Sequence, residues 1–535
     1  MSSSTEPQAE LSAPAPQQSH SLRTQNSSGE DFTSRDIEKN AYSEAPLPPP
    51  SPPNKLLLLA AYLKSLRHLQ IETRGIHRVA PSSRHDLQTL GFQQIFLVWF
   101  SINLEAIVLA IGFLGPITFS LSFKDSAFLA TFGAFVGALP VAYIATFGPR
   151  SGNRTMVLTR YVMGWYPSKV IVGLTLVVFI GYMMIDAVVG GQILSAVADA
   201  DLSVIVGIVI VCLVTWVVST LGYGVFHVYE RYAWVPQLIV ISILAGVAGP
   251  KFDLYGDPGE GLERNVIAGN RLSFFSLCLA AIITYAQGAA DFFVYYPVET
   301  SRWKVFVSTL AGLVLSSTYA LVVGVGLGSG VATNPDWAAA YQRGQGALLV
   351  EAFKPLGSFG SLCSVILALS LIGNMVPPTY ASGIDFQALG RYWQKVPRIF
   401  WNTVALLIAM VCGIAGRGHL AEIFTNFLAV MGYWVSIWIA IFLEEHLVFR
   451  KWRGLGWTWE AWNDRTRLPL GIAALVAFLV GWVGSILCMA QVWYVGPLAK
   501  LISGYGGDMG NYVGFAWAAI AYPPLRWLEL RFFGR

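Results

Sequence analysis

The stretch Trp99-Phe100-Ser101-Ile102-Asn103-Leu104-Glu105 places polar residues in the middle of an apolar run that continues to Gly112 and Gly115-Pro116. Five apolar runs later, Tyr285-Ala286-Gln287-Gly288-Ala289-Ala290-Asp291 does the same. A helix in lipid satisfies its own backbone, so it can unwind only where protein covers it or where it lines a cavity. Transporters built on inverted repeats bind their substrates at such breaks, in corresponding helices of the two halves. The two stretches therefore predict a five-plus-five inverted repeat.

The composition of the chain is that of a membrane protein. Of its 535 residues, 55% are hydrophobic and 12% are charged, whereas an ordinary soluble domain is about 25% charged. Apolar runs of about twenty residues have the length of a helix that spans a bilayer. We predict an all-α polytopic membrane protein with twelve transmembrane helices, ten in the repeat and two beyond it. The predicted spans cover residues 92–116, 124–147, 168–195, 202–222, 232–250, 273–296, 305–330, 357–380, 398–416, 421–444, 469–492 and 511–529.

The N-terminal part of the chain has a different composition. Residues 1–54 are rich in Ser, Pro, Gln and Glu, and such a segment cannot bury enough apolar surface to fold. We expect it to be a disordered cytoplasmic tail. Residues 55–91 are predicted to form a juxtamembrane segment, because their apolar stretch 56–63 is too short to span a membrane. The transmembrane transporter domain is then expected to cover residues 92–535.

The distribution of basic residues predicts the orientation, because Lys and Arg are enriched in short cytoplasmic loops. With the N-terminus inside, the predicted loops hold fifteen basic residues on the cytoplasmic side and eight on the external side. We therefore expect both termini to be cytoplasmic, in a protein of the plasma membrane. The cytoplasmic set is Arg150, Arg154, Arg160, Lys169, Arg231, Arg302, Lys304, Arg391, Lys395, Arg398, Arg450, Lys451, Arg453, Arg465 and Arg467, and the external set is Lys124, Lys251, Arg264, Arg271, Arg343, Lys354, Arg417 and Lys500.

Several classes of chemistry have no support in the sequence. None of the seven histidines lies in the middle of a predicted span, which argues against a haem-bearing membrane enzyme. There is no Walker A motif, and the five cysteines lack metal-binding or paired spacing. The small net charge of +4 does not point to nucleic acid. We therefore expect no enzymatic activity, no cofactor and no metal.

Three ionisable residues inside the predicted spans are candidates for function, because charges are costly in a membrane. They are Glu105, Asp186 and Asp291. Asp186 follows Tyr182 by four residues, so the phenol and the carboxylate share one helix face. An aromatic ring beside a hydrogen-bonding group suits a flat heterocycle. The alternative is that Asp186 only bonds a neighbouring helix, and that Glu105 lies at the outer mouth.

The eighth predicted span contains Ser370-Leu371-Ile372-Gly373-Asn374-Met375-Val376-Pro377-Pro378. The two prolines remove backbone donors and are expected to bend or open the helix. Asn374 could then offer a donor and an acceptor to a ligand. A kink without a binding role is the alternative.

Several stretches resemble those of the fungal purine-cytosine permeases, members of the nucleobase–cation symporter family. The resemblance covers residues 72–460 and is carried by Glu72-Thr73-Arg74-Gly75-Ile76, Gly148-Pro149-Arg150-Ser151-Gly152, Tyr229-Glu230-Arg231-Tyr232, Ala289-Ala290-Asp291, Thr300-Ser301-Arg302, Phe386-Gln387-Ala388-Leu389-Gly390, Asn426-Phe427-Leu428, Gly432-Tyr433-Trp434 and Glu445-His446. It implies twelve helices with a LeuT-like core and proton-coupled uptake of cytosine, adenine, guanine or hypoxanthine. Relatives in the same branch carry vitamin B6.

The chain departs from this family where substrate is expected to bind. The third helix of the family usually has Trp followed four residues later by Asn, and here those positions hold Tyr182 and Asp186. A Trp is usual at the place of Tyr285, and of the usual Asn-Asn-x-Pro-Asn in the eighth helix only Asn374 remains. An ionised carboxylate only accepts hydrogen bonds. Asp186 should therefore favour ligands with N–H or O–H groups or a positive charge.

We interpret the chain as a divergent member that imports a purine or cytosine nucleobase, or a related planar heterocycle, with a proton or another cation. Vitamin B6 is the alternative substrate. A non-transporting receptor is a further alternative, although the tail offers no signalling domain, and a channel would differ by conducting without saturation. Tyr182 and Tyr285 are predicted to stack on the substrate, and Ser101, Asp186, Gln287 and Asn374 to hydrogen-bond to it. Glu105 is predicted to couple the proton, and Asp291 either to couple it or to hold the broken sixth helix.

Overall fold

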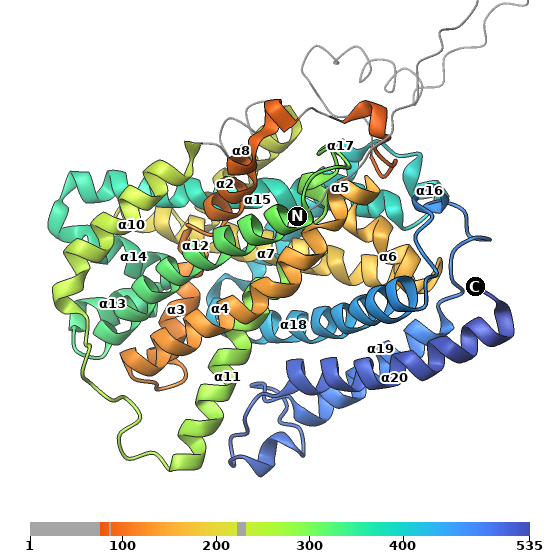
Figure 1. Cartoon of the computed structure of the whole chain (residues 1–535). Helices are drawn as coiled ribbons and strands as arrows, with labels where there is room; N and C mark the ends of the chain where they lie inside the picture. Colours follow the sequence, from red (N-terminus) through yellow and green to blue (C-terminus); the bar gives the residue numbers. More distant parts are fainter. Residues whose placement is uncertain (1–74, 85–86, 222–231) are drawn as a thin grey trace, which may run out of the picture. The chain divides into compact units, whose positions relative to one another are not determined.

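The computed structural model describes residues 75–84, 87–221 and 232–535. The predicted tail 1–54 and the apolar stretch 56–63 lie outside these residues. Each of the twelve predicted spans overlaps a helix, or a helix pair in the case of the first span. The helices are α2 (Leu87–Ile102) with α3 (Ala106–Ile117), α4 (Phe123–Ala145), α7 (Pro167–Val197), α8 (Val204–Leu221), α10 (Trp234–Ala248), α11 (Arg264–Ile283), α12 (Arg302–Val331), α15 (Ser358–Ala388), α17 (Arg398–Gly416), α18 (Leu420–Glu444), α19 (Ile472–Cys488) and α20 (Gly510–Phe533) (Figure 1).

The length and composition of these helices fit a membrane protein. Among the described residues, eight helices are long and apolar enough to cross a bilayer, and nine if α2 and α3 count as one span. Two more, α8 and α19, are apolar but shorter. The predicted all-α polytopic fold is confirmed.

Both predicted breaks are present. The first span bends by 55° between α2 and α3. The sixth span is an α-helix only to Ile283; it continues as two short 3₁₀ turns, η4 (Thr284–Gln287) and η5 (Asp291–Phe293), and no further α-helix forms before α12. The break is therefore longer than the polar residues of the sequence indicated, and the second half of the predicted span 273–296 is not α-helical.

The paired prolines do not open their helices. α15 is helical through Pro377 and Pro378, and α20 through Pro523 and Pro524. Each proline only removes one N–H, so in α15 the carbonyls of Gly373 and Asn374 lose their usual donors. Packing of α15 against α7 and of α20 against α19 holds the helices despite this loss.

Short helices lie between the spans. α5 (Phe147–Ser151) and α6 (Thr155–Met163) connect α4 to α7, and α16 (Arg391–Gln394) precedes α17. The helices α13 (Pro335–Arg343) and α14 (Gln345–Phe353) connect α12 to α15, and α14 packs on α7. The side chain of Asn334 caps α13 by accepting from the backbone N–H groups of Asp336 and Trp337.

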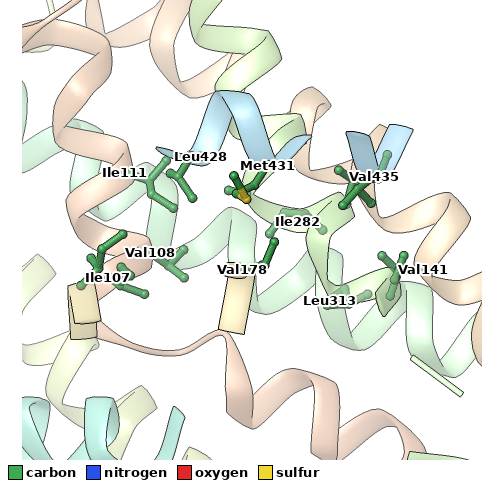
Figure 2. Close-up of a cluster of buried hydrophobic side chains, with 14 of the residues drawn as sticks. Ile107, Val108, Ile111, Val141, Val178, Ile282, Leu313, Leu428, Met431 and Val435 are labelled. Carbon is green, nitrogen blue, oxygen red and sulfur yellow. The ribbon is translucent and has the colours of Figure 1, made fainter. Parts of the chain in front are cut away.

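Helices of the first half pack on helices of the second half. α12 packs on α3 and α4, α11 on α4, and α15 on α7. Figure 2 shows part of the resulting core, in which apolar side chains from six helices meet and none of the labelled ones is more than 8% exposed. They come from α3, α4, α7, α11, α12 and α18, and the labelled ones are Ile107, Val108, Ile111, Val141, Val178, Ile282, Leu313, Leu428, Met431 and Val435.

Two glycines allow α3 and α12 to approach closely. A Cβ on Gly112 would lie 2.4 Å from the carbonyl oxygen of Leu321, and one on Gly324 would lie 2.1 Å from that of Leu109. Both contacts are with backbone, which cannot move aside. Small residues at helix crossings serve this purpose in membrane proteins, and the pair fixes the second half of the first span against the seventh.

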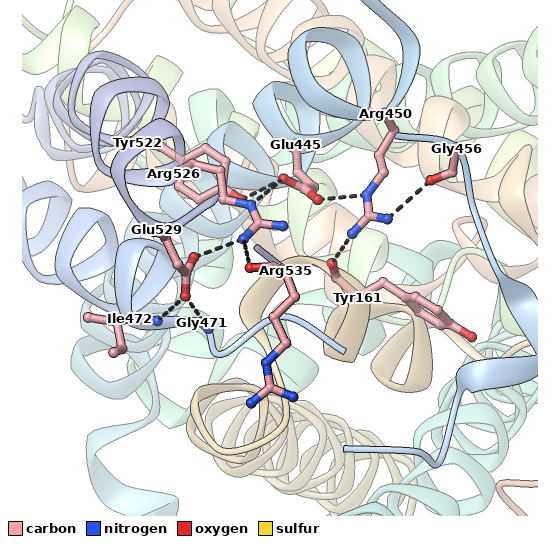
Figure 3. Close-up of polar contacts among 10 residues, drawn as sticks. All are labelled: Tyr161, Glu445, Arg450, Gly456, Gly471, Ile472, Tyr522, Arg526, Glu529 and Arg535. Atoms are coloured by element: carbon pink, nitrogen blue, oxygen red, sulfur yellow. Dashed lines mark hydrogen bonds and ion pairs between the residues drawn. The ribbon is translucent and has the colours of Figure 1, made fainter. Parts of the chain in front are cut away.

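A buried ionic cluster attaches the last two helices to the core (Figure 3). Glu445 lies at the start of η8 (Glu445–Trp452), a π-helical continuation of α18. Its carboxylate accepts from Arg450 at 2.7 Å and from Arg526 of α20 at 3.1 Å. Arg526 also donates to Glu529 at 3.0 Å. Glu529 in turn accepts from the N–H groups of Gly471 and Ile472 at the start of α19. α19 and α20 lie side by side next to α18 (Figure 1).

Arg526→Met should destabilise the protein strongly, because it leaves Glu445 and Glu529 buried without their shared cation. Breaking a buried ion pair from one side costs about 3–5 kcal/mol. We expect a clear drop in the unfolding temperature of the detergent-solubilised protein. Arg531→Met, at an exposed position of the same helix, is the control and should have little effect. Equal stability of the two variants would show that the cluster is dispensable.

A second buried polar group holds the loop between α19 and α20. Asp508 accepts from Tyr433 of α18 and, at 2.7 Å, from Gln491. Its backbone N–H donates to Ser273 of α11 at 3.0 Å. Burial raises the pKa of Asp508 to about 6, and hydrogen bonds from Tyr433, Gly510 and Gln491 oppose this rise. The protonated form therefore fits the folded loop better than the charged form.

Stability should fall as the pH rises through the raised pKa of Asp508. The pKa of Asp508 in the folded protein lies above that of an unfolded Asp. The stability that its protonated form contributes is therefore present at low pH and is lost towards neutrality. One pKa unit corresponds to about 1.4 kcal/mol, so we expect a loss of about 1 kcal/mol between about pH 5 and about pH 7.5. Asp508→Asn should remove this part of the pH dependence of thermal unfolding. If Asp508→Asn unfolds with the same pH dependence as the parent protein, other groups cause that dependence.

Candidate functional site

The break in the first span exposes polar groups to the interior of the bundle. Ser101 is buried in the last turn of α2, and Glu105 sits in an extended conformation directly before α3. The Glu105 side chain does not cap this helix. Asn103, between them, donates from Nδ2 to the carbonyl of Trp99 at 2.9 Å. Within the described part of the chain, both carboxyl oxygens of Glu105 and Oδ1 of Asn103 are buried and have no hydrogen-bond partner.

Asp186 and Asn374 meet across the interface of α7 and α15. The amide of Asn374 donates to Oδ2 of Asp186 at 3.0 Å, although the two residues are 188 positions apart. Asp186 is completely buried. Its second oxygen, Oδ1, has no partner among the described residues. Asp186 therefore bonds a neighbouring helix through one oxygen and keeps the other available.

Aromatic rings surround these polar groups. The hydroxyl of Tyr182 shares a hydrogen bond with that of Thr284 at 2.8 Å, which ties the third helix to the break in the sixth. The ring of Tyr182 packs edge-to-face on Phe427 of α18, at 5.9 Å between centroids. Tyr285 makes the same kind of contact with Trp99 of α2, at 6.0 Å. Both tyrosines are partly buried.

These groups converge on one place. Glu105 lies close enough to Asp186 for their carboxyl groups to interact electrostatically. The hydroxyl of Tyr285 interacts with Glu105, Asp186 and Tyr182. The structure thus brings together Tyr182, Asp186, Tyr285 and Asn374, which were predicted to bind substrate, and Glu105, which was predicted to couple a proton.

The break in the sixth span contributes a further polar side chain. Gln287 is buried in η4, two residues after Tyr285, and both atoms of its amide lack a partner in the part of the chain that the structure describes. Space remains beside the next residue, because a Cβ on Gly288 would meet only the ring of Phe179, at 4.0 Å. Gln287 is thus a buried amide with unused donors and acceptors.

Asp291 takes part in a different set of contacts. Its carboxylate accepts from the N–H of Thr155 at 2.6 Å and from the Thr155 hydroxyl at 2.8 Å, at the first residue of α6. The backbone carbonyl of Asp291 accepts from Arg154 at 3.2 Å, and Arg154 also donates to the hydroxyl of Tyr380 at 3.1 Å. An acidic side chain at a helix N-terminus is stabilising. These contacts suit the second predicted role of Asp291, holding the broken sixth span.

Three residues that the structure places at the site were not predicted from the sequence. Trp99 lies against Tyr285, and its indole Nε1 has no partner among the described residues. Asn103 carries the unused oxygen described above. Phe427 lies against Tyr182. All three belong to stretches with a visible signal, the polar run of the first span and the motif Asn426-Phe427-Leu428, but spacing alone does not show which side chains face inward.

Two unwound spans meet inside a helical bundle, and in the described part of the chain buried polar groups at the breaks have no partner. This arrangement is that of a membrane transporter. Comparison with known proteins gives the family. Residues 86–505 match the family model described as permeases for cytosine/purines, uracil, thiamine and allantoin, and the chain belongs to this family. The purine-cytosine permease fcyB of Emericella nidulans is 36% identical over 87% of this chain and 90% of its own length. The vitamin B6 transporter of Saccharomyces cerevisiae is 30% identical over 91% of this chain and 92% of its own length.

Solved structures confirm the inverted-repeat fold. A nucleobase-cation-symport-1 family transporter, in a closed conformation with bromovinylhydantoin bound, superposes with a TM-score of 0.66 at 12% identity over 86% of this chain and 96% of that one. A Na⁺-coupled sialic acid symporter superposes with a TM-score of 0.52 at 15% identity, over 88% of this chain and 97% of the symporter. The predicted five-plus-five core with two additional helices is the shared architecture.

Asp186→Asn should change the ranking of substrates rather than weaken all of them equally. The remaining amide oxygen can still accept from Asn374, so the helix contact survives, but an NH₂ donor replaces the free carboxylate acceptor. A hydrogen bond to a buried charged group contributes about 1.5–3 kcal/mol, or roughly ten- to a hundred-fold in affinity. Adding Tyr182→Trp should shift the preference further towards ordinary nucleobases. Competition by several bases and pyridoxine measures this, and an unchanged order would place the binding site elsewhere.

Proposed function

We propose that this permease imports a purine or cytosine nucleobase, or a related planar heterocycle, together with a proton by alternating access. The observation that carries the proposal is the set of buried oxygens on Glu105 and Asp186 that have no partner among the described residues, beside the partly buried side chains of Tyr182 and Tyr285. Flat rings stack on aromatic side chains while polar groups read their edges. The family description and the purine-cytosine relatives support this substrate class.

Vitamin B6 is the second candidate. The transporter of Saccharomyces cerevisiae that is 30% identical carries this name, and Tyr182 and Asp186 stand where nucleobase permeases usually have Trp and Asn. A pyridine ring with several hydroxyl groups would also present donors to Asp186. The purine-cytosine class is favoured, because several of the relatives carry that name.

A proton is the proposed coupling ion. Glu105 is the proposed group for it, since it is buried beside Asp186 without an ion-pair partner among the described residues. Asp291 keeps its proposed part in coupling or in holding the sixth span, and its contacts with α6 favour the second. We further propose a plasma-membrane location with both termini in the cytoplasm, from the distribution of basic residues.

Uptake of radiolabelled compounds tests the proposed function. Cells that lack their own nucleobase and pyridoxine permeases are given this chain and a panel of cytosine, adenine, guanine, hypoxanthine, uracil and pyridoxine. We expect saturable uptake of at least one purine or cytosine, accumulated against its gradient and reduced by a protonophore. Uptake restricted to pyridoxine would favour the second candidate. Linear, unsaturable entry would indicate a channel, and binding without uptake a receptor.

A further inference from the structure

A row of phenylalanines covers the exposed face of α4. Phe128, Phe132 and Phe135 are 68%, 50% and 39% exposed. They follow one another at helical spacing, so they lie on one face of the helix. The helix belongs to a span that is long and apolar enough to cross a bilayer, and this face therefore contacts the lipid. We call these three residues the phenylalanine row. It begins little more than one turn into α4 and ends near the middle of the helix.

The usual distribution of aromatic residues in membrane proteins does not account for the row. Aromatic side chains concentrate at the two membrane–water interfaces. The other exposed phenylalanines among the described residues agree with this rule, because they lie at the ends of α15, α17 and α20. The exposed large apolar side chains of α8 and α19 are Val, Ile and Leu. Aliphatic side chains thus suffice for contact with acyl chains elsewhere in this protein, and the aromatic face of α4 needs another explanation. The phenylalanines at helix ends are Phe359, Phe400, Phe532 and Phe533.

The rings of the row are arranged in order. The planes of the Phe128 and Phe132 rings are 5° apart, with 6.1 Å between centroids. Phe135 follows at 6.3 Å from Phe132 and at 28°. Phe275 of α11 lies beside the row, 5.9 Å from Phe132. Aromatic rings arranged in this way form a rigid surface on which another flat, rigid body can pack with little loss of conformational freedom.

A polar pair lies at the outer end of the row. Arg271 of α11 donates from Nε and Nη2 to Asp125 of α4, at 2.9 and 2.6 Å. Both bonds go to Oδ2, and no side chain or backbone group of the described residues donates to Oδ1. Asp125 lies one turn before Phe128 on the same face, and Arg271 lies one turn before Phe275. A hydrogen-bond acceptor at the membrane surface is thus followed by aromatic rings that extend into the bilayer.

The occupant that fits this surface has a single polar group at one end and a flat, rigid apolar body. From Asp125 to Phe135 the helix rises by ~15 Å, at 1.5 Å per residue. The polar end must bring a hydrogen-bond donor, because the group left over at the surface is a carboxylate oxygen. A hydroxyl supplies that donor, whereas the phosphodiester of most phospholipids does not. A flexible acyl chain would also lose rotamer freedom on the row, whereas fused rings have none to lose.

We propose that the face formed by α4 and α11 binds a sterol, whose fused rings pack on the phenylalanine row and whose hydroxyl donates to Oδ1 of Asp125. In the proposed orientation the site lies in the external leaflet, since α4 begins outside. This inference does not depend on which substrate the protein carries. Its observations are the order of the exposed rings and the acceptor at their outer end.

The site connects two helices that support the break in the sixth span. α4 crosses α11 so closely that a Cβ on Gly137 would lie 2.7 Å from the carbonyl oxygen of Leu279. α11 ends at Ile283, directly before η4, and α4 also packs on η4. A sterol that contacts α4 and α11 together therefore stabilises the folded protein by binding to it alone. We expect added sterol to raise the unfolding temperature of the purified protein.

Photolabelling of the full chain tests the proposal. The purified protein is placed in phosphatidylcholine vesicles with a diazirine-bearing sterol, and labelled peptides are identified by mass spectrometry. We expect the label on α4 and α11 and its displacement by unlabelled ergosterol or cholesterol. The 3α-hydroxy epimer keeps the rings but turns the hydroxyl away, so it should displace the label at least about five-fold less effectively.

A double variant removes the ring contacts and keeps the face apolar. Phe128→Leu with Phe132→Leu should lower labelling at least about five-fold and abolish the rise in unfolding temperature. Phe400→Leu, at an exposed position of α17, is the matched control and should change neither. If the double variant does not fold, Phe128→Leu alone, which removes the most exposed ring, is held to the same criteria.

The remaining outcomes count against the proposal. Label spread evenly over the exposed helices, or unchanged in the double variant, would overturn the site. Equal displacement by both epimers would overturn the hydrogen bond to Asp125. If the sterol-free protein is a dimer that the double variant dissociates, the row binds a second copy of the chain instead. None of these measurements requires transport, so their failure would leave the proposed function intact, and absence of uptake would leave the sterol site intact.

Discussion

The structure depends on one constraint, that backbone unwound within a membrane must be covered by protein. The chain is unwound around Asn103 in the first span and again from Thr284 onward in the sixth. Much of the cover comes from the opposite half, because α12 packs on α3 and α4 packs on η4; α18, of the same half, also packs on η4. The close crossing at Gly112 and Gly324 brings this cover within backbone contact. The long helices thus form a frame around two short irregular segments.

The positions of the breaks could be predicted from sequence, because polar and ionisable residues are costly inside an apolar run and concentrate where a span serves a site. The sequence also predicts that Tyr182 and Asp186 share one helix face, because this depends only on their spacing within one helix. The bond between Asp186 and Asn374 could not be predicted, because it joins residues far apart in the chain and depends on how α7 packs on α15. Which oxygens remain without partners depends on the same packing.

Other features differ from the sequence-based expectation for identifiable reasons. Pro377-Pro378 does not open α15, since a proline in a packed helix costs one or two hydrogen bonds that neighbouring helices offset. The helices α13 and α14 are too short for a spanning pattern. The full length of the break in the sixth span could not be predicted, because its residues are nearly as apolar as those of a helix. Composition thus indicates where a span is polar, but not how far it unwinds.

The site and the contacts of Asp291 are linked through this irregular segment. One end is fixed to the third helix by the hydrogen bond between Tyr182 and Thr284. The other end is fixed to α6 by the hydrogen bonds that Asp291 accepts from Thr155. If substrate stacks on Tyr182 and Tyr285 as proposed, it acts on the same few residues that hold α6. Those residues lack the continuous hydrogen bonds of a helix, so they can change conformation at a lower free-energy cost than the long helices. They are therefore the segment through which substrate binding could be transmitted to α6.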